Sequence, residues 1–202
     1  MIERKIIWKG AEANIYLEDG RLVKERVSKK YRLPEFDRRV RKNRTSREGR
    51  LLQKAFELGV SVPKVYKIDE RSFTIVMEYV EGELVKDVFE SDESSINPIA
   101  RQVGALLRRL HDNGIVHNDL TTSNLIIRDG KVHIIDFGLA FHSSRLEDRA
   151  MDLVVFKKSI LATHTTRSGR IWDGTIEGYR PEKEILSRIS TIEKRVRYAG
   201  GS

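Results

Sequence analysis

The feature that most constrains this 202-residue chain is a pair of motifs in its second half. His117, Asp119 and Asn124 follow the spacing H-x-D-x-x-x-x-N, and Asp136 opens an Asp-Phe-Gly sequence a short distance further on. Two apolar stretches with an Asp-Gly turn between them occupy 125–135, which predicts a pair of short antiparallel strands. Because a hairpin returns the chain to its starting edge, we expect the side chains of Asp119, Asn124 and Asp136 to converge.

Three converging oxygen donors suit a hard divalent cation such as Mg²⁺. They also suit in-line phosphoryl transfer, in which positioning and charge neutralisation do most of the catalytic work. We predict that Asp119 is a catalytic residue and that Asn124 and Asp136 bind Mg²⁺. A single carboxylate that only caps a turn is common, but this joint spacing between predicted strands is far more specific.

A charged pair is predicted in the first half of the chain. Lys24 lies in the middle of an expected strand, 21–27, and a buried lysine is costly unless it is paired. Glu48 lies three and four residues before Leu51 and Leu52 on the next predicted helix, so it faces inward and needs a cation. We predict that Lys24 pairs with Glu48 and contacts nucleotide phosphates; the alternative is that Lys24 points outward.

Two further segments are predicted to contact a nucleotide. The loop 9–14 joins the expected strands 2–8 and 15–17, and its backbone N–H groups are suited to phosphates. The segment 78–80 lies where strands give way to helices, and its backbone is suited to hydrogen bonds with adenine. The residues assigned to these contacts are Lys9, Gly10, Ala11, Glu12, Ala13, Asn14, Glu78, Tyr79 and Val80.

The order of elements predicts an α+β fold. The first 80 or so residues alternate as strands, interrupted by one helix that ends at Gly59. Helical periodicity dominates after Gly82, with helices expected around 99–110, over 151–161 and from Pro181 onward. Trp172 and Tyr179 lie in a polar segment before the last helix and are expected to pack or to contact a partner. The expected apolar stripes are Leu51, Leu52, Ala55 and Phe56; Ile99, Val103, Leu106, Leu107 and Leu110; and Ile185, Ile189, Ile192 and Val196.

Positive charge is concentrated in one stretch. The chain carries a formal net charge of +8, and the stretch 28–50 holds ten basic and three acidic residues. Such a cluster can bind nucleic acid, phosphate or an acidic partner, or it can be a solvated helix face. The basic residues are Lys29, Lys30, Arg32, Arg38, Arg39, Arg41, Lys42, Arg44, Arg47 and Arg50.

Composition excludes several classes of protein. The chain has no cysteine, so disulfide frameworks, thiolate zinc sites and cysteine nucleophiles are excluded. No signal peptide and no apolar run long enough to span a bilayer are recognisable, which favours a cytoplasmic location. The five histidines are too dispersed to predict a zinc site, and His117 is expected to brace the loop that carries Asp119.

These motifs resemble the protein-kinase fold over most of the chain. The resemblance implies a phosphate lysine at Lys24, a helix glutamate at Glu48, a catalytic aspartate at Asp119, and magnesium ligands at Asn124 and Asp136. It also implies ATP as the nucleotide, and a single minimal kinase domain with an N-lobe at 1–80 and a reduced C-lobe at 81–202.

The chain differs from ordinary protein kinases in ways that are typical of one group. It keeps one glycine of the glycine-rich loop, Gly10, it has Asn118 where arginine is usual, and it lacks an Ala-Pro-Glu segment. These features, with His-x-Asp-Leu-Thr-Thr-Ser-Asn and the stretch 30–34, are similar to the small atypical kinase subunit of the KEOPS complex. Asn118 also departs from the glycine expected in that group.

The resemblance to the KEOPS subunit implies a function and partners. It implies a serine/threonine kinase and ATPase that works in the threonylcarbamoyladenosine modification of transfer RNA. The implied partners are a metal-containing threonylcarbamoyl transferase subunit and a small subunit that binds the N-lobe. We expect the stretch 29–50 to serve transfer RNA or assembly, and the basic tail 195–200 to touch the transferase.

Two other functions stay open on the sequence. A small-molecule phosphotransferase of the aminoglycoside or sugar type shares the spacing H-x-D-x-x-x-x-N, but Asp136-Phe137-Gly138 argues against it. A non-catalytic module that binds nucleotide together with RNA or a partner is the other alternative.

Overall fold

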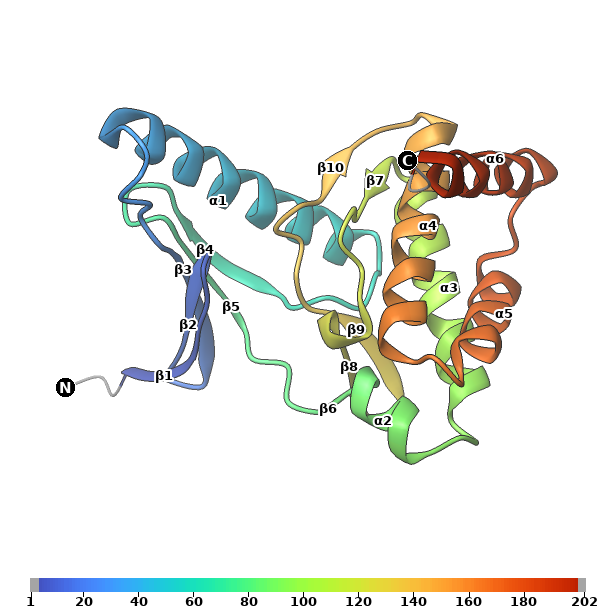
Figure 1. Ribbon diagram of the computed structural model, residues 1–202. Helices are drawn as coiled ribbons and strands as arrows, with labels where there is room; N and C mark the ends of the chain where they lie inside the picture. The colour runs from blue at the N-terminus through green and yellow to red at the C-terminus, as the bar shows by residue number, and fades with distance from the viewer. Residues whose placement is uncertain (1–3, 200–202) are drawn as a thin grey trace. The chain divides into compact units, whose positions relative to one another are not determined.

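The protein divides into two compact units, residues 1–81 and 82–202. The structure, a computed structural model, describes the backbone of residues 4–199 and the side chains of residues 4–195 (Figure 1). The predicted α+β fold is confirmed, because strands dominate the first unit and helices the second.

The first unit is built on a five-stranded antiparallel sheet of order β1-β2-β3-β5-β4. Lys24 of β3 pairs with Ile15 on one side and Ile75 on the other, so it lies in the central strand, as expected. The turn between β2 and β3 places Asp19 and Gly20 at φ values of 48° and 71°, which Asp and Gly tolerate. The strands are β1 (Arg4–Lys9), β2 (Ala13–Glu18), β3 (Arg21–Arg26), β4 (Val65–Asp69) and β5 (Thr74–Glu78).

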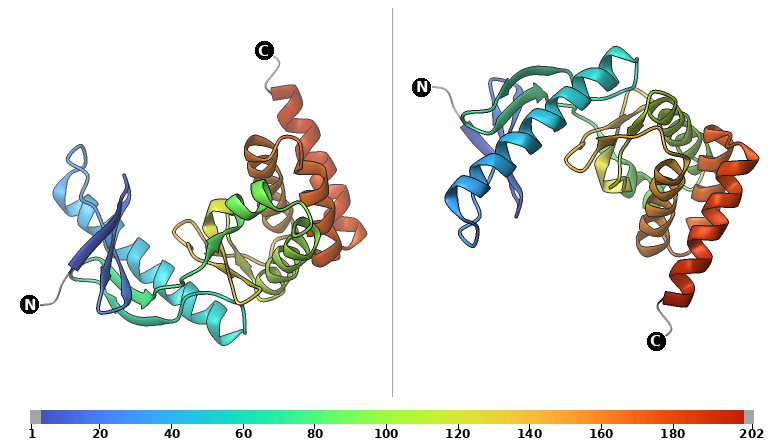
Figure 2. Two further views of the ribbon diagram at one scale, coloured as in Figure 1. Left: turned by 90° about the horizontal axis from the view of Figure 1, so that it is seen from below. Right: turned by 90° about the horizontal axis from the view of Figure 1, so that it is seen from above.

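One long helix, α1 (Pro34–Glu57), packs against β4 and β5 of this sheet (Figure 2). It begins with a proline in its first turn and is followed by Gly59 at a φ of 72°. Leu51, Leu52 and Ala55 are buried, as the predicted stripe requires. Phe56 was predicted to share that stripe and does not, since it is 46% exposed. Phe56 therefore lies outside the buried face of α1.

The second unit is mainly helical. Its longest helices are α3 (Ile96–Asp112), α4 (Leu146–Thr163) and α6 (Lys183–Ala199). The shorter α2 (Val85–Ser91) precedes α3, and α5 (Ser168–Tyr179) lies between α4 and α6 in the chain. Small sheets of order β6-β8-β9 and β10-β7 support the loop that contains Asp119. Their elements are β6 (Glu83–Leu84), β7 (Ile115–Val116), the 3₁₀ turn η1 (Thr122–Asn124), β8 (Leu125–Arg128), β9 (Lys131–Ile134) and β10 (Phe141–His142).

The apolar stripes of the second unit lie largely inside, although Leu106 is only half-buried and the side chain of Val196 lies outside those described. Val103, Leu107 and Leu110 of α3 are buried, and so are Ile185 and Ile189 of α6. Helix α4 extends beyond the predicted 151–161 at both ends. Within residues 4–199, no helix is both long and apolar enough to cross a bilayer.

Helix α5 was missed, because the segment around Trp172 and Tyr179 was read only as polar. It packs closely on α3 through glycines. A methyl group on Gly104 would come within 2.0 Å of the Thr175 carbonyl oxygen, and one on Gly178 within 2.0 Å of the Arg101 carbonyl oxygen. Much of this contact is therefore close backbone approach at glycines, which weakens the apolar pattern that would predict a helix from the sequence.

Candidate active site

The first unit holds a buried charge cluster around Glu48. Lys24 Nζ donates to Glu48 Oε1 at 2.6 Å, so the predicted ion pair is present. Arg26 Nη2 donates to the other carboxylate oxygen, Oε2. The side chains are 11%, 6% and 1% exposed for Lys24, Arg26 and Glu48. One buried carboxylate thus contacts two cationic side chains.

Sequence reasoning missed Arg26, although a signal was available. Residues two apart on a strand point to the same face, so an inward Lys24 implies an inward Arg26. Lys24 and Arg26 both contact the Glu48 carboxylate, and two cationic side chains gathered in one place suit an anionic ligand.

The loop 9–14 is held to α1 by charge. Glu12 lies 2.7 Å from Arg44 and 3.5 Å from Lys29, measured between carboxylate oxygen and side-chain nitrogen. Gly10 N donates to Ala13 O at 3.0 Å, so this amide closes the hairpin loop. A phosphate contact of residues 9–14 stays a prediction.

The segment 78–80 contains the last residue of β5, Glu78, and the two residues after it. Glu78 N donates to the Lys64 carbonyl at 2.8 Å, and Glu78 Oε2 accepts from Lys64 N at 3.2 Å. Val80 is buried and Tyr79 is exposed. An adenine contact of this segment stays a prediction.

The second unit brings Asp119, Asn124 and Asp136 together. Asn124 Nδ2 donates to the Asp119 carbonyl at 3.1 Å, and Ile135 N donates to the Asn124 carbonyl at 3.0 Å. The second bond ties the loop to the residue before Asp136, as the predicted hairpin requires. Asp136 Oδ1 accepts from Gly138 N at 2.7 Å, which orients its carboxylate.

The pKa values of this loop reflect its partial burial. Burial raises the pKa of Asp119, and the negative charge of Asp136 raises it further against the opposing effect of His117. Burial lowers the pKa of His117, although Asp152, Asp136 and Asp119 act in the opposite direction. Asp119 is therefore a better proton acceptor than a free aspartate, beside a histidine that favours its neutral form.

The donor set fits a magnesium ion that also binds phosphate. Among the residues whose side chains are described, no three or more His, Cys, Asp or Glu groups cluster as a metal site. Magnesium in phosphate sites usually needs only one or two protein carboxylates, with water and phosphate oxygens completing its coordination. Asp136 and Asn124 supply oxygen donors, and a cation there would relieve the repulsion between Asp119 and Asp136.

Asp152 of α4 is a second residue that sequence reasoning missed. It is buried, and its two oxygens accept from His117 N at 2.8 Å and from Asn118 N at 2.7 Å. His111 Nε2 lies 2.9 Å from the same carboxylate, and His111 Nδ1 lies 2.8 Å from the Tyr179 hydroxyl. The loop backbone is thus fixed from the interior of the unit.

The electrostatics of Asp152 favour its charged form. Burial raises its pKa, but the hydrogen bond and charge of His111, with the His117 contacts, outweigh this effect and lower it. No local motif marks this residue, because its partners lie 34 to 41 positions away.

The backbone also explains Asn118. Its φ is 67°, in the left-handed region that glycine and asparagine tolerate best. Asparagine can therefore occupy the position where the related group was expected to have glycine.

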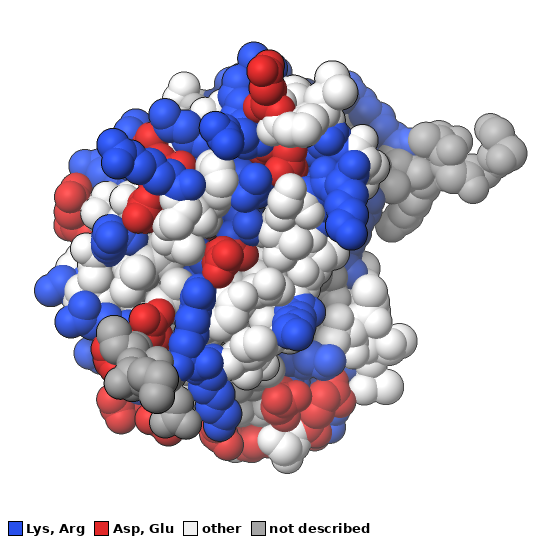
Figure 3. Space-filling view, turned by 90° about the vertical axis from the view of Figure 1, so that its left-hand side faces the viewer, with Lys and Arg blue, Asp and Glu red and all other residues white. Residues whose placement is uncertain are grey.

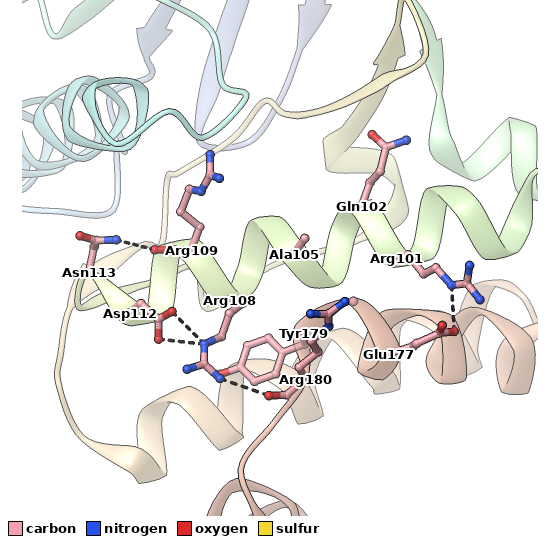
Figure 4. Close-up of a pocket in the computed structure, with 11 residues that line it drawn as sticks. Arg101, Gln102, Ala105, Arg108, Arg109, Asp112, Asn113, Glu177, Tyr179 and Arg180 are labelled. Carbon is pink, nitrogen blue, oxygen red and sulfur yellow. Dashed lines mark hydrogen bonds and ion pairs between the residues drawn. The ribbon is translucent and has the colours of Figure 1, made fainter.

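A surface groove of about 870 Å³ lies elsewhere, along α3 and α5 (Figure 4). Arg101 pairs with Glu177 at 2.8 Å, and Arg108 pairs with Asp112 at 2.8 Å. The residues predicted to bind nucleotide or Mg²⁺, or to act in catalysis, are not among those that line this groove.

This fold and loop geometry define a protein of the kinase class. A protein-family model described as "Protein kinase domain" matches residues 3–165. Two solved structures share the fold at low identity. The Rio2 kinase from Chaetomium thermophilum, solved as an ADP/Mg²⁺-phosphoaspartate complex, has a TM-score of 0.67 at 16% identity, over 98% of this chain and 71% of its own. WaaP, solved with acyl carrier protein, has a TM-score of 0.60 at 15% identity, over 96% and 89%.

Sequence relatives narrow the class to one family. The KEOPS complex subunit Bud32 of Pyrococcus abyssi is 43% identical over 96% of both chains. The chain belongs to the Bud32 family. A probable bifunctional tRNA threonylcarbamoyladenosine biosynthesis protein of Methanococcus maripaludis is 41% identical over 98% of this chain, and the chain spans 37% of its length. The corresponding protein of Methanocaldococcus jannaschii gives the same identity and coverage.

Proposed function

We propose that this protein is an ATP-dependent phosphotransferase and ATPase that acts in the threonylcarbamoyladenosine modification of transfer RNA. Lys24, Glu48 and the segments 9–14 and 78–80 bind the nucleotide. Asp119, Asn124 and Asp136 carry the transfer chemistry.

In the proposed reaction, Asp119 accepts the proton of an attacking serine or threonine hydroxyl, or of water. The new P–O bond forms at the γ-phosphorus while the bond to the β-phosphate oxygen breaks, and ADP leaves. A bound Mg²⁺ ion, held by Asn124 and Asp136, would supply charge neutralisation of the phosphates. Lys24 would stabilise the phosphate charge, and Glu48 would hold Lys24 in place.

One observation carries this proposal: the hydrogen-bonded loop that brings Asp119, Asn124 and Asp136 together within a single unit. Asn124 Nδ2 donates its hydrogen bond to the Asp119 carbonyl, so Oδ1 is the atom of this side chain that can bind a cation. The raised pKa of Asp119 adds a suitable proton acceptor.

ATP turnover by purified variants tests the proposal. Asp119→Asn and Asp136→Asn should each lower kcat by roughly 10²-fold or more, the scale expected for losing a key electrostatic group. Asp129→Asn is the matched control, because Asp129 occupies the exposed hairpin turn and asparagine tolerates its φ of 52°. Turnover near that of the unmodified protein in both test variants would overturn the assignment.

The setting of the reaction is also a proposal. The KEOPS relative is named as a subunit of a complex, and the bifunctional relatives extend far beyond the part that matches this chain. We place the protein in the cytoplasm beside a metal-containing threonylcarbamoyl transferase subunit and a small subunit that binds its N-lobe. The proposed transferase contact uses the tail 195–200, in which the side chains from 196 onward lie outside those described.

Transfer RNA is the proposed ligand of the stretch 29–50. Asp37 pairs with Arg41 at 2.7 Å and with Arg32 at 3.6 Å, so part of the positive charge is neutralised internally. Arg38 and Arg39 line hollows at the start of α1, where Phe36 is 47% exposed. Figure 3 shows that Lys and Arg side chains cover much of the face it displays. Guanidinium groups beside an exposed aromatic ring suit phosphates and unstacked bases.

Salt-dependent binding of transfer RNA tests this surface. The double variant Arg38→Gln/Arg39→Gln should reduce the slope of log affinity against log salt by roughly 1.4–1.8, because two phosphate contacts are lost. The variant Lys54→Gln/Lys67→Gln makes the same charge change at other exposed positions of the unit and should leave the slope near that of the parent. Equal slopes in the two variants would contradict an RNA contact at Arg38 and Arg39.

A further inference from the structure

The loop that carries Asp119 has a second tie to the interior, at Thr122. Thr122 lies between Asp119 and Asn124 and is 2% exposed. Its hydroxyl lies 2.8 Å from His164 Nε2, and His164 is also 2% exposed. His164 is the residue that follows the last turn of α4. A residue of the functional loop is therefore hydrogen-bonded to the end of a helix 42 positions away.

The histidine is itself fixed by a carboxylate. Its Nδ1 lies 2.6 Å from Glu90 Oε1, and Arg167 Nη1 donates to Glu90 Oε2 at 3.0 Å. The His164 hydrogen bond lowers the pKa of Glu90 against a smaller opposing effect of burial. Phe89 packs edge-on against the imidazole, with ring centroids 5.6 Å apart. The ring is thus held on three sides.

In the neutral ring, this arrangement favours the tautomer that carries its proton on Nδ1. A carboxylate at Nδ1 takes the N–H of the neutral ring, so Nε2 is left to accept from the Thr122 hydroxyl. Carboxylate, imidazole and hydroxyl in this order also occur in hydrolytic triads. Here the hydroxyl is buried, so it has no access to an external substrate and cannot act as a nucleophile toward one.

We propose that Thr122 and His164 are positioning residues for phosphoryl transfer: their hydrogen bond sets the backbone of 119–124 and so the separation of Asp119 and Asn124. Ser159 of α4 adds a further tie to the same loop, because its hydroxyl donates to the Leu120 carbonyl at 3.2 Å. The effect on catalysis rests on the proposed function. The hydrogen bond between Thr122 and His164 can also be tested by a measurement that does not need activity.

Thr122→Val and Thr122→Ser form a matched pair. Valine keeps the shape of threonine and removes the hydroxyl, whereas serine keeps the hydroxyl. We expect Thr122→Val to lower kcat about tenfold and the KM for ATP to change less than about twofold, because a lost hydrogen bond misplaces the loop without touching the nucleotide. Thr122→Ser should recover most of kcat. Thr163→Val, on an exposed neighbour of His164, is the control and should behave like the parent protein.

A purely structural role would lower Tm while leaving the kcat of the folded protein in place, and that result would overturn the proposal. Equal kcat in the valine and serine variants would also overturn it. Hydrogen exchange at the Asn124 amide, which donates to Thr121 O at 3.0 Å, gives the readout that does not need activity. Thr122→Val should speed this exchange about tenfold.

The two readouts separate the possible failures. If the parent protein turned over no ATP but Thr122→Val still loosened the Asn124 amide, the proposed function would fail and the tie would stand. If the exchange rate were unchanged in Thr122→Val, the tie would be refuted whatever the turnover.

Discussion

The two units position their functional groups by different means. In the first unit, ion pairs position the charged side chains, because Glu48 binds both Lys24 and Arg26 in a buried cluster. In the second unit, the side chain of Asp119 is exposed and does not brace its own loop. The backbone around Asp119 is instead fixed by Asp152 and by His164, acting through amides and a hydroxyl.

The difference follows from what each group is proposed to do. A lysine that meets phosphate needs a counter-ion to stay charged and oriented before the ligand arrives. An aspartate that accepts a proton must not be paired with a cation, because pairing would lower its pKa. Asp119 is exposed and its pKa is raised, while Asp152 and His164 hold the backbone of its loop.

Glu48→Gln should have the largest effect on stability. It removes the buried carboxylate charge that both Lys24 and Arg26 contact, a change that typically costs about 3–5 kcal/mol of unfolding free energy. Urea unfolding measures this loss. Glu57→Gln, at the exposed end of α1, is the matched control and should cost less than about 1 kcal/mol. Similar values for the two variants would mean that the cluster is not held by charge.

Asp152→Asn should have an intermediate effect. Asparagine keeps one carbonyl oxygen for a backbone N–H but presents an NH₂ group to the other, so about 1–3 kcal/mol should be lost. Turnover should fall about tenfold or more, because the misplaced loop carries Asp119. Asp173→Asn, on the exposed side of α5, is the control. Full kcat in Asp152→Asn would show that the loop keeps its geometry without this carboxylate.

Asp119→Asn should have the smallest effect on stability, and of opposite sign. The folded-state pKa of Asp119 is raised, so its ionisation is disfavoured by the fold, and its contribution is lost as pH rises through that pKa. Asparagine removes the cost, so Tm at pH 7 should rise by about 1–2 °C while activity is lost. The difference should shrink as pH falls through the raised pKa and disappear below about pH 4, where the aspartate is protonated in the folded and the unfolded protein alike. A lower Tm at pH 7 would contradict this account.

Much of the fold and part of the site were predictable from local patterns. The hairpin at 125–135 and the stripe of α3 have strong periodicity, and Lys24 with Glu48 follows from the cost of burying either alone. The contacts of Asp152 and His164 were not predictable, because each joins residues more than 30 positions apart and neither residue has a motif around it. Helix α5 was not predicted, because Gly104 and Gly178 make part of its contact with α3 and add nothing to an apolar pattern.

We propose that Lys24 and Asp136 act on the same ATP molecule. A double-mutant cycle on kcat/KM for ATP, with Lys24→Met, Asp136→Asn and the combination, tests it most directly. Groups that act as a unit are strongly non-additive, so the double variant should be little worse than the more damaged single variant. If the two fold-losses simply multiplied, the groups would act independently, and the account of a single phosphotransferase site would be contradicted.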